Sequence, residues 1–322
     1  MARDRSSDAA EHSLAIRAAW LHYVGGLRQT EVASRIGVTS VKAHRLIARA
    51  VAEGAVKVSI EGDIVECLEL EAAMAARFGL DTCEVAPDLG EQGIPFRALA
   101  LAGAAFLRRV SDGDDALTIG IGHGRTLAEA VRAMPGFKTS NLSYVSLLGG
   151  LTRNFAANPH DVMHLLADKT GARAYVLPVP FFANTAEDRE VLLAQRGVRE
   201  VFTMAEKAAL RIVGIGTVGG DTQLVNSGMI EPAEIEEISR AGGVAEMQGH
   251  FFDRDGALLD TSLTSRTLAV SLDAGRNAGR DDRIVALVGG PEKEAPLRAM
   301  LESGRLSGLV TDERTARAVL AG

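Results

Sequence analysis

The spacing of apolar residues along the segment 13–53 predicts three short helices in succession. The first lies within 13–26 and ends at two glycines, the second covers about Gln29–Ile36, and the third runs to about Glu53. Gly37 permits a tight left-handed turn between the last two helices. Two short helices joined by such a turn are typical of a helix-turn-helix, a motif that reads DNA in many proteins.

The two later helices divide their side chains between a core and an outer face. Val32 and Leu46 are apolar and face a common core, and Ala33 is small where the helices must cross closely. The outer face carries donors for phosphates and base edges, of which Arg45 suits a guanine and Arg49 a phosphate. The alternative is a small helical bundle with a solvated basic face that contacts protein. The predicted DNA-contacting residues are Gln29, Thr39, Ser40, Lys42, His44, Arg45 and Arg49.

The pattern changes soon after the third helix, and we place a domain boundary near Gly62. Residues 55–60 alternate between apolar and polar side chains as a strand does, which fits a small wing after the helices. We therefore expect a winged-helix-like helix-turn-helix domain over 1–61 and a larger domain over 62–322. One recognition helix reads only a few base pairs, so we also expect a symmetric homo-oligomer, a dimer or a tetramer.

From residue 62 onward, helical segments alternate with short, fully apolar runs. This alternation predicts an α/β domain with a parallel sheet covered on both faces. The expected strands are 116–122, 142–150, 173–180, 210–216 and 283–290, and 308–320 holds one more strand and helix. The other expected helices are 62–80, 94–110, 125–134, 160–170, 187–196, 232–240 and 291–302. In the helix 62–80 the residues expected near one face are Ile64, Leu68, Ala72, Ala75 and Phe78.

A glycine-rich strand end, GIGHGRTLAEA, is the best candidate for a binding site. Gly122 and Gly124 flank His123, and Arg125 and Thr126 then open a helix. Backbone amides, a hydroxyl, a guanidinium and a helix N-terminus converge there, which predicts a cradle for a phosphate or a polyhydroxyl compound. The motif lacks the lysine of a Walker loop and the third glycine of a dinucleotide fingerprint. Tight turns without a ligand are the alternative interpretation.

Two more glycine-rich strand ends and one acidic turn carry candidate binding residues. GGLTRN places Arg153 after a strand, and GGPEKE places Lys293 just inside a helix. In GHFFDRDG, Asp253 is positioned to bond sugar hydroxyls, although turn formation accounts for acidic residues in such a sequence. His160 and His164 are four residues apart, but no carboxylate motif accompanies them, so we expect no metal site and no cofactor.

Charge and composition narrow the functional class. Of the net charge of −7, residues 1–60 contribute +4 and the remainder −11, as expected for a DNA-binding module on a separate regulatory domain, with chance clustering as the alternative. The two cysteines form neither a metal motif nor a disulfide framework, and the N-terminus lacks the apolar core of a signal peptide. We therefore expect a cytoplasmic protein without a membrane span.

The succession of motifs resembles the SorC/DeoR-type family of bacterial sugar-responsive transcriptional regulators over about residues 13–320. After the helix-turn-helix the motifs are GIGHGRTLAEAV, LLGGLTRN, YVLPVP, IVGIGT, GHFFDRDG, VGGPEKEAPLRA and LVTDERTA. The resemblance implies an effector domain similar to the sugar-phosphate isomerase and deaminase fold without its catalysis. It also implies dimers of dimers or tetramers, and a sugar, usually phosphorylated, that changes the affinity for double-stranded operator DNA.

The resemblance also implies roles for individual residues. Gly122, Gly124, Arg125 and Thr126 would form an anion-binding loop beside His123. On the opposite side would lie Gly150 and Arg153, and the effector's hydroxyls and phosphate would be contacted by Asp253 and Lys293. This sequence departs from the family at Ala43-His44-Arg45, where the family commonly has Val-Ser-Arg, and at Arg28, where it often has Thr. The variant is similar to a branch associated with polyol catabolism, erythritol among the candidates, which makes an unphosphorylated polyol another possible effector.

We therefore expect a DNA-binding regulator, a repressor by the commoner logic, of a carbohydrate or polyol catabolic operon. Its effector would be a sugar phosphate, a sugar or a polyol. A sugar-phosphate isomerase or deaminase is the runner-up, but it leaves the basic N-terminal module unexplained, and the sequence offers no convincing acid–base pair. A metabolite-binding scaffold whose N-terminal module docks a protein is the third hypothesis.

Overall fold

The computed structural model describes residues 2–56, 64–112, 116–152, 160–219, 222–273 and 283–322, with side chains described from residue 11 onward. The chain divides into two compact units, Met1–Gly62 and Asp63–Gly322. None of the helices in these described ranges is long and apolar enough to cross a membrane.

The N-terminal unit consists of the helices α1 (Ala2–Tyr23), α2 (Gln29–Ile36) and α3 (Ser40–Ala52). The bounds of α2 are those predicted, and Thr39 caps α3, since its hydroxyl accepts a hydrogen bond from the Lys42 amide at 3.3 Å. The turn between these helices has φ of +69° at Gly37. Of the predicted wing strand, residues 57–60 lie outside the described residues.

Small residues let these three helices pack closely around one core. The fully buried members include Ala15 and Ala18 of α1, Val32 of α2, and Ala43 of α3. Alanines at the crossings bring the helix backbones together, and the larger Leu46 fills the space between them. Sequence periodicity thus correctly predicted a helix-turn-helix with a shared core.

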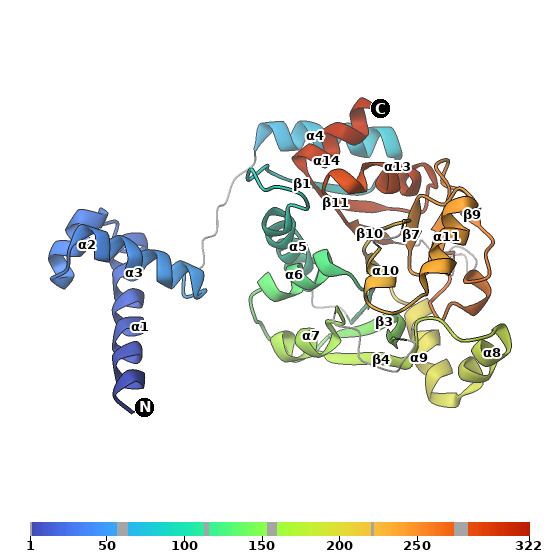
Figure 1. The fold of residues 1–322 in the computed structure, drawn as a ribbon, viewed down its shortest axis with the longest axis horizontal. Coiled ribbons are helices and arrows are strands. Elements are labelled where there is room, and N and C mark those ends of the chain that lie inside the picture. Colours follow the sequence, from blue (N-terminus) through green and yellow to red (C-terminus); the bar gives the residue numbers. More distant parts are fainter. Residues whose placement is uncertain (1, 57–63, 113–115, 153–159, 220–221, 274–282) are drawn as a thin grey trace. The chain divides into compact units, whose positions relative to one another are not determined.

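The larger unit is built on a seven-stranded, entirely parallel sheet in the order β1-β11-β10-β5-β2-β3-β4 (Figure 1). The order in which strands are added to the sheet reverses between β2 and β5. After β2, the strands β3 and β4 extend the sheet on one side, whereas β5, β10 and β11 extend it on the other. The strands are β1 (Thr82–Ala86), β2 (Leu117–Ile121), β3 (Leu142–Leu151), β4 (Arg173–Pro180), β5 (Leu210–Val213), β10 (Ile284–Leu287) and β11 (Gly308–Asp312).

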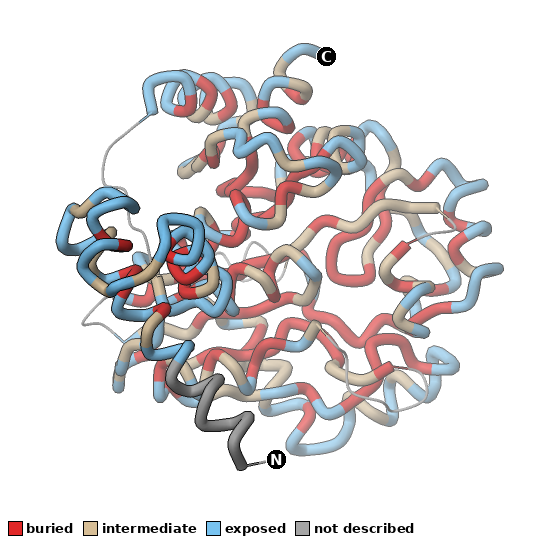
Figure 2. Tube along the Cα trace, turned by 60° about the vertical axis from the view of Figure 1, so that its left-hand side comes forward, coloured by how far each residue is buried: buried red, intermediate tan, exposed pale blue. Residues whose placement is uncertain are grey.

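Helices cover both faces of this sheet, as the apolar strands predict. Alternate residues of β10 show the two faces, since Ile284 and Ala286 belong to one apolar cluster and Val285 and Leu287 to the other. Figure 2 shows the buried trace following the strands, with exposed residues on the outer helices. The first face is covered by α4 (Val65–Phe78), α9 (Arg196–Glu206), α13 (Glu294–Glu302) and α14 (Glu313–Ala321). The second is covered by α5 (Phe96–Val110), α6 (Arg125–Ala133) and α7 (Met163–Thr170).

A small antiparallel sheet, which the sequence did not predict, follows β5. It consists of β6 (Gly216–Thr217), β7 (Ala245–Met247), β8 (His250–Phe252) and β9 (Leu258–Leu259), in that order. Phe251 of β8 belongs to a third apolar cluster with residues of α10 (Gln223–Asn226) and α11 (Pro232–Arg240). The remaining elements are α8 (Ala186–Ala194) and the short helices η1 (Thr264–Arg266) and η2 (Pro291–Lys293).

The expected inner face of the helix 62–80 was right only in part, because Ala75 and Phe78 pack against an apolar cluster but Ile64, Leu68 and Ala72 are exposed. In α4, Cys67, Leu70 and Met74 are buried, whereas Ile64 and Leu68 are exposed. Apolar residues surround most of this helix, so periodicity alone could not choose between two stripes. The buried stripe, Cys67, Leu70 and Met74, belongs to the apolar cluster that also contains residues of β11, α13 and α14.

Candidate functional site

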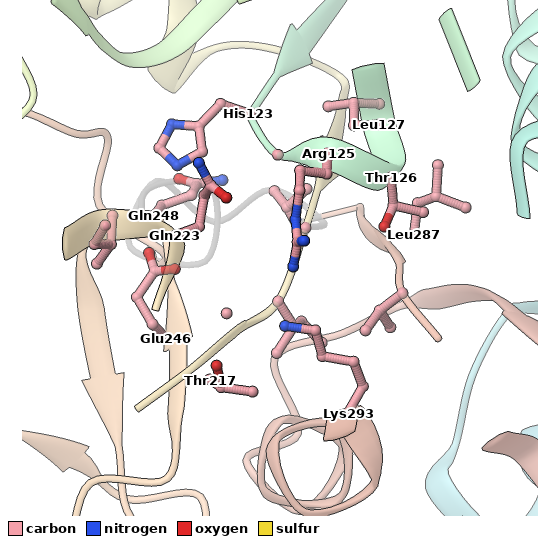
Figure 3. Close-up of a pocket in the computed structure, with 18 of the residues that line it drawn as sticks. His123, Arg125, Thr126, Leu127, Thr217, Gln223, Glu246, Gln248, Leu287 and Lys293 are labelled. Carbon is pink, nitrogen blue, oxygen red and sulfur yellow. The ribbon is translucent and has the colours of Figure 1, made fainter. Parts of the chain in front are cut away.

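A cavity opens at the carboxyl ends of β2, β5 and β10, the three central strands of the parallel sheet. Its empty volume is ≈ 760 Å³, part of which is open to solvent. The cavity therefore lies where the strand order reverses, the usual ligand position in open α/β sheets. Figure 3 shows His123, Gln223 and Gln248 on one side of it, with Arg125 and Lys293 extending toward each other on the other.

The loop between β2 and α6 forms one wall of the cavity, as the glycine-rich motif predicted. The Gly122 amide donates to the Ile212 carbonyl at 2.8 Å, which ties the loop to β5. Gly124 has φ of +135°, a conformation that a side chain would strain, and it caps α6. Arg125 then opens the helix, half exposed, with a guanidinium nitrogen 3.8 Å from a Glu292 carboxylate oxygen. Helix N-terminal amides and a cation thus face the cavity from this wall.

Lys293 reaches the cavity from η2, directly after β10. A buried carboxylate steadies the preceding turn, because Asp312 and Thr315 both accept hydrogen bonds from the Gly290 amide, at 3.1 and 2.8 Å. Burial lowers the pKa of Lys293, while the carboxylates of Glu292 and Glu246 counteract that shift. The ammonium group therefore stands in a partly desolvated position, where contact with an anion or a hydroxyl is favourable.

Glu246 of β7 contributes a carboxyl group from the small antiparallel sheet. The residue is 6% exposed, and its Oε1 accepts a hydrogen bond from the Gly249 amide at 2.6 Å. Burial raises the pKa of Glu246 to about 7, against the opposing effects of that amide and of Lys293. Near neutral pH this group can therefore both donate and accept a hydrogen bond.

Gln248 and His123 place further polar atoms at the cavity wall. Gln248 is 4% exposed, and among the described residues neither of its side-chain amide atoms has a hydrogen-bond partner. The buried Nδ1 of His123 likewise has no partner in the described part of the chain. Burial lowers the pKa of His123 to about 4, so its ring is neutral at physiological pH. It packs edge-on against Phe181 at a centroid distance of 5.1 Å.

Gln223, at the start of α10, links the cavity to the segment preceding α7. Its Nε2 lies 2.9 Å from Nε2 of His160, which accepts the hydrogen bond in the corresponding tautomer. His160 lies before α7, and His164 is exposed on it, so the two histidines do not share a helix face. Within the described ranges, no group of three or more His, Cys, Asp or Glu side chains is placed to hold a metal ion.

The predicted effector residues fall into three groups. Gly122, His123, Gly124, Arg125, Thr126 and Lys293 line the cavity together. Gly150 and Asp253 are not among the residues that line it, and Arg153 lies outside the described residues. The Asp253 carboxylate accepts hydrogen bonds from the amides of Asp255 and Ala257, which is the turn role that the sequence also allowed. Gly150 lies against the Asp161 carboxylate near the start of α7.

Sequence reasoning missed five polar residues that line the cavity. Thr217, Thr222 and Gln223 follow β5, and Glu246 and Gln248 come from the β7–β8 hairpin. The strands that carry Thr217 and Glu246 have only two and three residues, too few for an alternation pattern to be visible. The dipeptide Gln248-Gly249 was the available signal, because glycine in the second turn position favours a two-residue hairpin.

The predicted DNA-contacting residues of the N-terminal unit differ in exposure. Arg49 is half-buried, with its Nε 2.6 Å from a Glu53 oxygen and an Nη 3.3 Å from a Glu11 oxygen. The pair with Glu11 ties α3 to α1, and both ion pairs compete with any phosphate for the guanidinium. The exposed members are Gln29, Thr39, Ser40, Lys42, His44 and Arg45.

Comparison with known proteins gives a consistent result. Residues 62–321 match the family model described as "Putative sugar-binding domain". The chain is 63% identical over 311 residues to the erythritol catabolism regulatory protein EryD of Brucella abortus, with 97% of each chain covered. It is 30% identical over 316 residues to the transcriptional regulator LsrR of Klebsiella pneumoniae subsp. pneumoniae, covering 97% of this chain and 94% of that protein.

The fold is likewise shared with solved structures. The full-length sorbitol operon regulator SorC from Klebsiella pneumoniae aligns with a TM-score of 0.68 and 22% sequence identity, covering 97% of this chain and 99% of that chain. At this identity the likeness concerns the fold alone. It extends over nearly the whole of both chains, so the order of a helical N-terminal unit and an α/β unit is the same.

Proposed function

Since the chain belongs to the SorC/DeoR-type family of sugar-binding transcriptional regulators, we propose that it represses a carbohydrate or polyol catabolic operon and is released from operator DNA by an effector. It is a regulator and not an isomerase or deaminase, as the names of its relatives indicate. Control of transcription places its action in the cytoplasm. The observation that carries the proposal is the polar cavity at the point where the sheet order reverses, in a chain that also has a helix-turn-helix.

The effector that fits this cavity is a small polyhydroxyl compound. Thr217, Gln223, Glu246 and Gln248 supply groups for hydroxyls, whereas Arg125 and Lys293 favour an anion such as a phosphate. The relative that is 63% identical is named for erythritol catabolism, so a four-carbon polyol or its phosphate is the first compound to test. Of the residues proposed from the sequence, Asp253 and Gly150 do not line the cavity, so we assign them no direct contact with the effector.

The N-terminal unit is proposed to bind the operator through the exposed face of α3. Thr39, Ser40 and Lys42 stand at its start, and His44 and Arg45 follow on the same exposed surface. Because one such helix reads only a few base pairs, we propose that the regulator acts as a homo-oligomer on paired half-sites. Arg49 contributes less than the sequence indicated, since Glu53 and Glu11 already pair with it.

A gel-shift titration tests the proposal. The probe is DNA from just upstream of the regulator's own gene cluster, with random DNA as competitor. We expect retardation that survives the competitor and is reversed by a sugar, a polyol or a phosphate ester of one. Equal affinity for both DNAs, with and without those compounds, would contradict the proposal.

Arg45→Ala gives a sharper test of the recognition helix. If Arg45 bonds a base edge, the change removes roughly 1–3 kcal/mol of discrimination between operator and random DNA. Lys42→Ala is the matched comparison, because a phosphate contact weakens binding to both DNAs alike and reduces the salt dependence. An equal loss on both sequences for Arg45→Ala would restrict this residue to the phosphate backbone.

A further inference from the structure

Gln248 occupies an unfavourable backbone conformation at the tip of the β7–β8 hairpin. Its φ is +53°, and it is the one non-glycine residue with a left-handed φ among the described residues. Gly249 follows with φ of +73°, so both residues of the turn are left-handed. Asparagine, aspartate or glycine is the usual first residue of such a turn, because other side chains are strained there. Strain of this kind is concentrated at functional sites.

The Gln248 side chain forms no compensating hydrogen bond with the described residues. It is 4% exposed, and neither Oε1 nor Nε2 has a hydrogen-bond partner among the described residues. A buried amide without partners destabilises the fold, whereas a leucine of similar size would not. Gln248 is therefore unfavourable in both its backbone and its side chain, unless a bound molecule supplies the missing partners.

The surroundings of Gln248 indicate the chemistry of that molecule. The neutral His123 ring, with its unpartnered Nδ1, and the Glu246 carboxyl line the same cavity (Figure 3). An amide, a neutral imidazole and a carboxyl whose pKa burial raises to about 7 can each pair with hydroxyl groups, which both donate and accept. None of the three carries the fixed positive charge that a phosphate requires.

The two cations of the cavity, Arg125 and Lys293, also line an adjoining cavity, which shares Gln223 and Thr217 with the first as well. His123, Glu246 and Gln248 line only the first cavity, although Lys293 is near enough to Glu246 to affect its pKa. Because Gln248 is 4% exposed and the Arg125 side chain is 46% exposed, the end with Gln248 is called the inner end and the end shared with the adjoining cavity the outer end. A ligand that spans both ends presents uncharged hydroxyls inside and any anionic group outside.

We propose that Gln248 is a specificity-determining residue, whose side-chain amide bonds uncharged hydroxyl groups of a polyol or sugar at the inner end of the cavity. This inference rests on the proposed function and narrows its ligand class. A compound lacking the inner hydroxyls loses affinity because the amide remains unpaired. A compound phosphorylated at its inner end is excluded, while phosphorylation at the outer end is tolerated.

Calorimetric titration of the purified full-length protein tests the proposal with three probes: erythritol, erythritol phosphate, and butane-1,2,3-triol, which lacks one terminal hydroxyl. Gln248→Leu is expected to weaken binding of the polyhydroxylated probes by roughly tenfold or more and to raise the melting temperature of the free protein. Gln248→Gly also removes the backbone strain at this position without adding an apolar side chain. It is likewise expected to weaken binding of the polyhydroxylated probes and to raise the melting temperature. Gln195→Leu, at an exposed position, is the matched control and leaves affinity unchanged.

Hydroxyl removal from the probe and amide removal from the protein together form a thermodynamic cycle. If the Gln248 amide bonds the deleted hydroxyl, the wild type discriminates erythritol from the triol and Gln248→Leu does not. Undiminished discrimination by both variants, or a lower melting temperature in both, would overturn the inference while leaving the proposed function intact. A wild type that binds none of the probes and whose operator complex ignores them would overturn both.

Discussion

Glu246 and His123 are buried in one cavity, and burial shifts their pKa values in opposite senses. The pKa of Glu246 rises to about 7, so stability falls from about pH 4.5 to about pH 7 as the unfolded chain releases a proton that the folded chain keeps. The pKa of His123 falls to about 4, so stability rises between about pH 4 and about pH 6.5. The two effects largely cancel in the wild type where these ranges overlap.

Glu246→Gln is expected to reveal the pH dependence of stability that the opposing effect of Glu246 cancels in the wild type. The amide keeps an oxygen for the Gly249 hydrogen bond but does not titrate. The free energy of unfolding of this variant, relative to the wild type, should therefore increase by about 3 kcal/mol between pH 4.5 and pH 8. Denaturant unfolding of both proteins at several pH values measures this difference in the free energy of unfolding. Parallel pH profiles for the two proteins would show that the Glu246 carboxyl titrates normally.

The residues of the cavity differ in how far the sequence could predict them. Gly122, His123, Gly124, Arg125 and Thr126 were found because they are consecutive and a strand end before a helix has a known local geometry. Lys293 was found through a second glycine-rich strand end of the same kind. The missed residues come from β6, from the start of α10 and from the hairpin that follows α11, and their approach to the cavity depends on tertiary packing that no local pattern encodes.

In the N-terminal unit, the α3 helix depends on a single capping residue. The Thr39 hydroxyl accepts from the Lys42 amide, and the residues of the first turn of α3 carry no acidic side chain to support it. Thr39→Ala should therefore destabilise this unit by about 1 kcal/mol, and Thr39→Ser should leave it close to the wild type. Hydrogen exchange of the 29–52 amides measures the difference. Equal protection in the two variants would show that the cap contributes nothing.

Elements with strong periodicity or clear end signals were predictable, and weakly patterned ones were not. Gly37 and Thr39 mark the ends of α2 and α3, so these helices were placed within a residue or two. The edge strand β1 was missed because its first three residues, Thr82–Glu84, are only partly buried and mix polar with apolar side chains. The helix α9 was missed because it follows α8 after a single residue, Gln195, without a turn signal.

The proposed function requires that an effector in the larger unit alter DNA binding by the N-terminal unit. The chain between them passes through residues 57–63, outside the described residues. An effector can shift the balance between DNA-competent and incompetent states only by its difference in affinity for them. By linkage, operator DNA must change the affinity for effector by the same factor. Effector affinity measured with and without saturating operator therefore checks the proposed coupling independently of any operator titration.

Lys293→Ala should separate effector binding from operator binding. Removing the partly desolvated ammonium group should weaken the binding of an anionic effector by roughly tenfold or more, since hydrogen bonds to charged groups contribute about 1.5–3 kcal/mol. Operator affinity without effector should stay at the wild-type value, because the substitution lies in the larger unit. Lys207→Ala, at an exposed position after α9, is the control. Unchanged affinity for every effector that releases the wild type would remove Lys293 from the site. A neutral polyol that binds Lys293→Ala normally while its phosphate does not would instead place the phosphate at the outer end of the cavity.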